Sequence, residues 1–234
     1  MMKVKGLVIF IMVVMMVIPV MAGKTKTADC KDNVLTDLKY DFTIDIPNNW
    51  KTKTFKEKAE KPEVLRALLT QKNYQINQQA RDLGGDFVIP EIQVYVRPAA
   101  MTAAEFFEKL KHDVELRSSD DNIINQMNLI LAGEFQGSQE VVLAGNKAIQ
   151  ALFKKPWKRQ LQAEADDPKY RAFGGRIVQD VHDVHEVYIF EHDGYLFVIN
   201  ALVENEFYRI VTEEFANIIS TLNFPTATEA AVKE

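Results

Sequence analysis

Hydrophobic and polar positions follow their clearest pattern between residues 184 and 224, where they predict a β-hairpin followed by a helix. Residues 187–190 and 195–203 are rich in β-branched and aromatic side chains, and Asp193 and Gly194 between them suit a tight turn. In the second strand, apolar residues fill both alternating sets of positions. Because such a strand needs cover on both faces, we expect it in the middle of a sheet.

The residues after this strand predict an amphipathic helix that packs back on the hairpin. Asn205 is the expected N-cap, and Glu206 suits the positive end of the helix dipole. Apolar residues then recur at three- and four-residue spacing as far as Leu222. Pro225 disfavours helical geometry in the residue before it, so the helix should end near Leu222.

Shorter stretches of the same two periodicities predict the other elements. Trp50, which follows a strand closed by Pro47, is expected to fill one end of the core. Gly145 and Asn146 suit the turn of a second hairpin. Strands are expected at residues 38–46, 91–97, 138–143, 147–153 and 176–181, and helices at residues 62–83 and from Thr102 to about Ser118. Together these elements predict a single α/β domain.

The N-terminus has the pattern of a secretory signal. Lys3 and Lys5 precede an uncharged apolar run, and Ala22 offers a small residue for cleavage. An uncleaved membrane anchor is the alternative, since the run is nearly long enough to span a bilayer. The expected organisation is a signal peptide (residues 1–22), a mobile polar tether (23–37), the folded domain (38–225) and a polar tail (226–234). The protein is therefore expected to be exported, to the periplasm or the extracellular space.

Charge and cysteine content narrow the classes of partner. Residues 1–22 hold two lysines and no acidic residue, so their removal takes the formal charge of the 234-residue chain from −5 to −7. A chain this acidic has no electrostatic basis for nucleic-acid binding. Cys30 is the single cysteine, which excludes an intrachain disulfide. Lipidation of Cys30 is an alternative, although the residues before it do not form a lipobox.

A long segment from residue 154 to 175 carries the residues we expect to contact a partner. It has the length of an insertion over one edge of the sheet, and loops of this length are either functional or mobile. Basic residues surround one tryptophan there, which is typical of a hot spot for an acidic protein patch or an anionic membrane. The candidates are Lys154, Lys155, Trp157, Lys158 and Arg159. The alternative is a solvated basic turn with Trp157 folded back as a local plug.

Histidines near the central hairpin are weak candidates for a metal site. His182, His185 and His192 lie among carboxylates, a common ligand set for metals. In an extended chain, however, His182 and His185 face opposite sides, so surface or edge positions are the default and no metal is predicted. No sequence of the G-x-S-x-G, Walker or H-E-x-x-H type occurs, which disfavours an enzyme. The fourteen phenylalanines suit strands and helix stripes, so no cofactor is predicted.

Three short motifs resemble the PsbP-like family, which includes exported bacterial and DcrB-like members. They are Asp-Phe-Thr-Ile-Asp-Ile-Pro at residues 41–47 with Trp50, Ala-Gly-Asn-Lys-Ala at 144–148, and Asp-Gly-Tyr at 193–195. The resemblance covers roughly residues 40–224. It implies an α/β/α sandwich around a mostly antiparallel twisted sheet and a non-enzymatic binding or assembly role. The segments at 51–86 and 154–175, and the lack of a lipobox, depart from the family.

These observations predict an exported, non-enzymatic binding or assembly module of the cell envelope. Its partner is expected to be an envelope protein or a membrane surface. A small-ligand carrier, or a hydrolase with a site under the 154–175 segment, is the alternative. A deep enclosed apolar cavity would favour the alternative, whereas a filled core with an exposed apolar or aromatic patch would favour the binding module.

Overall fold

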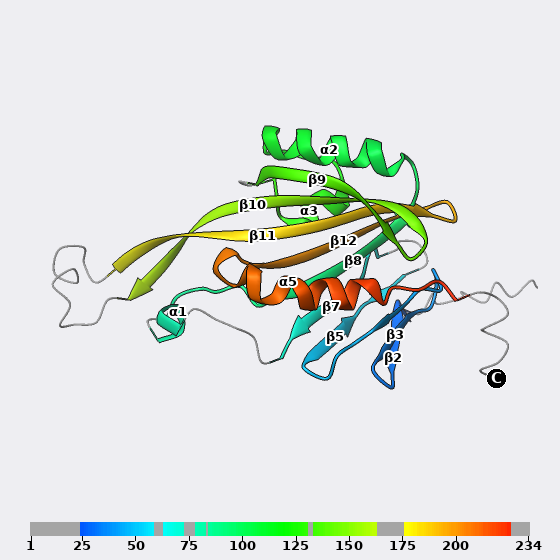
Figure 1. Cartoon of the computed structure of the whole chain (residues 1–234), viewed down its shortest axis with the longest axis horizontal. Coiled ribbons are helices and arrows are strands. Elements are labelled where there is room, and N and C mark those ends of the chain that lie inside the picture. Colours follow the sequence, from blue (N-terminus) through cyan, green and yellow to red (C-terminus); the bar gives the residue numbers. More distant parts are fainter. Residues whose placement is uncertain are drawn as a thin grey trace, which may run out of the picture.

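A seven-stranded antiparallel sheet forms the centre of the computed structural model, which describes residues 24–58, 63–72, 78–82, 84–130, 133–162 and 176–225 (Figure 1). The strand order is β5-β7-β8-β12-β11-β10-β9. The strands are β5 (Trp50–Thr54), β7 (Leu65–Gln71), β8 (Glu91–Pro98), β9 (Glu134–Leu143), β10 (Asn146–Gln162), β11 (Arg176–His192) and β12 (Tyr195–Glu204). The predicted hairpin is therefore β11–β12, and β12 is the middle strand, as predicted.

The two faces of β12 belong to two separate hydrophobic cores. Phe197 and Ile199 pack in one core, and Leu196 and Val198 pack in the other. α2 (Ala103–Leu116) and α3 (Asn122–Met127) cover the second face, and α5 (Asn205–Ser220) covers the first (Figure 1). The α/β/α sandwich implied by the family resemblance is thus confirmed.

Local signals in the sequence place the two main helices accurately. At the start of α2, the Thr102 hydroxyl accepts a hydrogen bond from the Glu105 N–H, and the Glu105 carboxylate accepts one from the Thr102 N–H. This is the predicted capping box. α5 begins one residue earlier than expected, because Glu204 occupies the N-cap and Asn205 is already helical. The helix ends at Ser220, close to the predicted position.

The prediction of a helix over residues 62–83 is wrong. Residues 65–71 form β7, which pairs with β5 on one side and β8 on the other, and among the described residues of this range only α1 (Gln78–Asp82) is helical. The apolar residues at positions 64, 65, 68 and 69 fit helical spacing. Pairing on both sides outweighs this local preference, because it satisfies the backbone of β7 and buries Ala67 and Leu69.

The prediction of a mobile tether over residues 23–37 is also wrong for the described part. This segment forms β1 (Thr25–Lys26), which pairs with β6 (Lys56–Glu57), and β2 (Ala28–Lys31) and β3 (Val34–Asp37). β2, β3 and β4 (Thr43–Asp45) make a three-stranded sheet on the α5 side of the molecule (Figure 1). The predicted strand over residues 38–46 is thus reduced to β4.

A buried ion pair ties this small sheet to the main one. Arg66 of β7 is fully buried, and its Nε lies 2.8 Å from Oδ2 of Asp37 at the end of β3. Its Nη1 lies 2.8 Å from Oε2 of Glu57, and its Nη2 donates to the Thr27 carbonyl. Charged side chains of a segment that is polar in sequence therefore fix that segment in place.

The predicted signal peptide and polar tail, residues 1–22 and 226–234, lie outside the described residues. In the described ranges, no helix is both long enough and apolar enough to cross a membrane.

The Arg66–Asp37 pair predicts that residues 24–37 contribute to stability. Asp37→Asn would leave the buried guanidinium with less compensation, and the free energy of unfolding should fall by about 3 kcal/mol. Asp29→Asn is the matched control, because the Asp29 side chain is 63% exposed and pairs with Lys26 only at the surface. Its effect should stay below about 0.5 kcal/mol. Urea denaturation measures both values, and equal small effects would mean that the segment is a tether after all.

Candidate functional site

β10 and β11 extend past the other strands as a two-stranded arm, defined here as residues 156–162 and 176–182 (Figure 1). Pairing of β11 with β12 ends at Asp183, and pairing of β10 with β9 ends at Lys154, whereas β10 and β11 stay paired as far as Gln162 and Arg176. The predicted insertion over residues 154–175 is therefore a strand at its start. Residues 163–175 lie outside the described residues.

The five predicted contact residues do not form one basic patch, because side chains alternate between the faces of a strand. Lys155, Trp157 and Arg159 lie on the α2 side of the sheet. Lys154 and Lys158 lie on the α5 side, and Lys158 is exposed, with its Nζ 3.8 Å from a carboxylate oxygen of Asp180.

Trp157 and Arg159 are held by internal contacts at the root of the arm. The Trp157 Nε1–H donates to Oδ1 of Asp183 at 2.8 Å. Arg159 is 1% exposed, and its Nη2 donates to Oε1 of Glu204 at 2.6 Å. The Arg159 guanidinium also lies 5.1 Å from the Trp157 ring centroid. This arrangement favours the interpretation of Trp157 as a local plug.

A cleft of about 630 Å³ lies beside this plug, and we name it the arm-root cleft. It opens on the α2 side of the sheet, at the end of α3. Residues of six strands, of the end of α3 and of one loop line it. They are Lys51 of β5, Thr70 of β7, Glu91 and Gln93 of β8, Lys155 of β10, Asp183 and His185 of β11, Leu202 of β12, Gln126, Met127 and Asn128 at the end of α3, and the loop residues Phe87, Val88 and Ile89.

Burial shifts the pKa values of the ionisable groups in the arm-root cleft. It raises the pKa of Asp183 to about 6, with a further contribution from the Glu204 charge. It lowers the pKa of His185 to about 3, so that this imidazole is neutral at physiological pH. Burial also raises the pKa of Glu91 and lowers that of Lys155. Several groups with shifted pKa values in one cleft are typical of a binding or catalytic site.

The three histidines considered as metal ligands lie apart. His182 is exposed on the face opposite His185, and His185 lines the arm-root cleft. His192 stacks on the Phe224 ring at 3.6 Å between centroids, near the turn of the hairpin. Within the described ranges, no group of three or more His, Cys, Asp or Glu side chains is placed to hold a metal ion.

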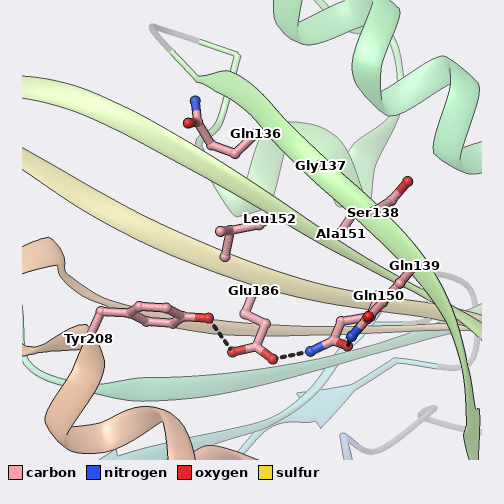
Figure 2. Close-up of a pocket in the computed structure, with 9 residues that line it drawn as sticks. All are labelled: Gln136, Gly137, Ser138, Gln139, Gln150, Ala151, Leu152, Glu186 and Tyr208. Atoms are coloured by element: carbon pink, nitrogen blue, oxygen red, sulfur yellow. Dashed lines mark hydrogen bonds between the residues drawn. The ribbon is translucent and has the colours of Figure 1, made fainter.

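A second pocket, of about 280 Å³, lies on the α5 side of the sheet next to β9, and we name it the edge pocket. Figure 2 shows Tyr208 of α5 pointing at the Glu186 carboxylate of β11, with Gln150 of β10 on its other side. Glu186 is 4% exposed and accepts hydrogen bonds from Tyr208 at 3.1 Å, from Tyr188 at 2.6 Å and from Gln150. Gln139 of β9 donates to the Gln150 carbonyl oxygen at 2.6 Å.

The edge pocket adjoins a free strand edge. Within the described residues, no strand pairs with the outer side of β9, which ends the sheet. Nothing in the sequence points to this pocket, because Gln139, Gln150 and Glu186 each resemble an ordinary polar position on a strand. Only the register of β9, β10 and β11 brings them together.

Comparisons with known proteins find similarity in fold. No family model and no curated protein matches the sequence. A solved structure of PsbP from the cyanobacterium Synechocystis is similar over 88% of this chain and 94% of its own, with 11% identity and a TM-score of 0.43. LpqN of Mycobacterium tuberculosis, described as involved in cell envelope biogenesis, is similar over 86% and 92%, with 12% identity and a TM-score of 0.41.

The raised pKa of Asp183 predicts how stability depends on pH. Between the ordinary value of 3.8 and about 6, folded Asp183 keeps a proton that the unfolded chain has lost, so its contribution to stability falls as pH rises through this window. Asp183→Asn removes this dependence and keeps an acceptor for Trp157. The free energy of unfolding of the variant, relative to the wild type, should rise by up to about 3 kcal/mol from pH 4 to pH 7.

Urea denaturation across this pH range measures the difference. Asp180→Asn on the same strand is the control, since the Asp180 side chain is 80% exposed, and its difference from the wild type should not change with pH. A constant difference for Asp183→Asn as well would contradict the raised pKa.

Proposed function

We propose that this protein is a non-enzymatic binding module of the cell envelope, which holds a partner protein by pairing an extended segment of it with β9. The carrying observation is the contrast between the two edges of the main sheet. β5, at one edge, has the exposed residues Lys51 and Lys53, and charged residues, lysine above all, discourage pairing with another strand. β9, at the other edge, has ten residues and no lysine, arginine or proline.

The side chains of β9 also suit an added strand. Val142 is 76% exposed and Phe135 is 40% exposed, although both are large apolar residues. The edge pocket lies directly beside the strand and offers the amides of Gln136 and Gln139. Peptide recognition by strand addition combines main-chain hydrogen bonds for affinity with neighbouring pockets for specificity. β9 and the edge pocket supply these two parts.

Charge indicates which segment fits. Glu134 and Glu140 are exposed on β9, and the strand has no basic residue to balance them. Opposite charges on facing strands stabilise pairing, and like charges oppose it. The partner segment is therefore extended and basic.

The packing of the core favours a protein partner over a carried small molecule at the centre of the fold. Side chains fill both cores around β12. The edge pocket lies at an edge of the main sheet, another pocket lies beside the small sheet, and the arm-root cleft lies across the sheet at the end of α3. The leader pattern in the sequence supports a location in the envelope.

Blocking the β9 edge should abolish partner capture without loss of folding. Ser138→Lys with Val142→Lys places two positive charges on exposed positions of β9, where they repel a basic segment. Immobilised wild-type chain should retain its partner from envelope extract. The affinity of the double variant for that partner should be lower by at least about ten-fold, which is the effect of one unfavourable charge contact. Val178→Lys with Ile210→Lys is the matched control, since these residues are also exposed and apolar.

A designed peptide locates the contact. A short capped peptide of alternating lysine and valine should perturb the backbone amide resonances of β9 and protect them from hydrogen exchange, whereas the same peptide with glutamate should not. Perturbation elsewhere, or equal capture by both double variants, would overturn the proposal. Sedimentation with anionic vesicles that the peptide does not inhibit would assign the contact to a membrane instead.

A further inference from the structure

Hydrogen bonds fix the orientation of the polar side chains on one wall of the arm-root cleft. The Tyr95 hydroxyl donates to the Gln93 side-chain oxygen at 2.9 Å, and the Asn200 amide donates to the same oxygen at 2.8 Å. The Gln93 amide nitrogen in turn donates to the Glu91 carboxylate at 2.9 Å. The side-chain amides of Gln93 and Asn200 therefore have a fixed orientation, and Glu91 is the last acceptor of this hydrogen-bond network.

The same network fixes the tautomer of His185. Its Nδ1 lies 3.1 Å from the Asn200 side-chain oxygen. Because the Asn200 nitrogen already donates to Gln93, this oxygen is an acceptor, and the proton of His185 must lie on Nδ1. Its Nε2 is then an acceptor as well. His185 is 2% exposed, so this ring is a fixed part of the cleft wall.

Asp183 brings a buried negative charge to the cleft. It is 7% exposed, and Oδ1 accepts the bond from Trp157. No other hydrogen bond to this carboxylate comes from the residues that the structure describes. A carboxylate with so little exposure is costly to leave without partners, and a bound donor or cation would offset that cost.

Asp183 and Nε2 of His185 are the buried polar groups of this cleft, and both are acceptors. Glu91 is a third acceptor, and the cations of the described lining are Lys155 of β10, which is half-buried, and Lys51 of β5, which is exposed. Arg159 is already paired with Glu204. Leu202, Val88 and Ile89 add apolar surface to the same cleft.

We propose that the arm-root cleft binds a small aliphatic ammonium compound, with its ammonium group on Asp183 and its hydrocarbon part against Leu202 and the loop of Val88 and Ile89. The N–H groups of the ligand supply the donors that Asp183 and His185 lack. Glu91 stands two strands away from Asp183, at about 10 Å in the direction across the sheet. The cleft therefore has a second carboxylate at its far wall for a longer or doubly charged ligand.

This site is independent of the proposed partner surface. The arm-root cleft lies on the α2 side of the sheet, whereas the edge pocket lies on the α5 side. A negative result for ligand binding to the cleft would therefore leave the proposal for peptide binding to β9 intact, and the reverse also holds.

Three probes of equal carbon number test the ligand class. n-Butylammonium and putrescine, titrated into the full chain, should shift the backbone amide resonances of residues 88–93 and 183–185 in a saturable manner. Butyrate, which carries the opposite charge, should leave those resonances unchanged. Butyrate binding equal to or tighter than that of n-butylammonium would overturn the proposal.

Substitutions then test whether the charge of the cleft selects the ligand. Asp183→Asn should weaken n-butylammonium binding by at least about ten-fold, and Asp180→Asn should leave it unchanged. Lys155→Met removes the half-buried cation of the cleft, which lies opposite Asp183 in the strand register, and should tighten n-butylammonium binding. If Asp183→Asn unfolds the chain, Lys155→Met still tests the proposal. Weaker n-butylammonium binding by Lys155→Met would show that the cleft does not select cations.

Discussion

The need to cover both faces of β12 determines the rest of the fold. This strand has apolar side chains on both sides, so neither face can be left in water. α5 follows it without a loop and covers one face, while α2 and α3 cover the other. On the α2 side, the residues of β12 change from Leu196 and Val198 to Asn200, Leu202 and Glu204, of which two are polar. The helical cover ends at this change, and the arm-root cleft opens there.

The parts of the fold that can be predicted from the sequence are those with local causes. β12, α5 and the capped start of α2 depend on periodicity and on side chains within a few residues. The apolar spacing of β7 fits a helix as well as a strand, and only pairing with β5 and β8 decides between them. The segment before residue 38 is polar, which is typical of a tether. Its place in the fold depends on contacts that are distant in sequence, such as that of Asp37 with Arg66, 29 positions apart, and the packing of Ala28 and Leu35 in the first core.

Neither candidate site has a local signature. Lys154 to Arg159 are neighbours in sequence, but strand geometry sends alternate side chains to opposite faces. The arm-root cleft instead combines residues from β8, β10, β11, β12 and a loop, and the edge pocket combines three strands with α5. The sequence does place Lys155 and His185 among the candidates. It cannot give their partners Glu91 and Gln93, which lie about 60 to 90 positions earlier in the chain.

β11 explains why one polar stretch serves two separate surfaces. Asp183 and His185 face the arm-root cleft, while Glu186, the next residue, faces the edge pocket. In the sequence these residues resemble a metal-binding cluster, and in the strand they point apart. The two surfaces compensate these polar groups differently. Glu186 lies under α5 and accepts hydrogen bonds from Tyr208, Tyr188 and Gln150. Asp183 and His185 lie where the second core ends and the arm begins, so that they line a cleft and not an apolar core.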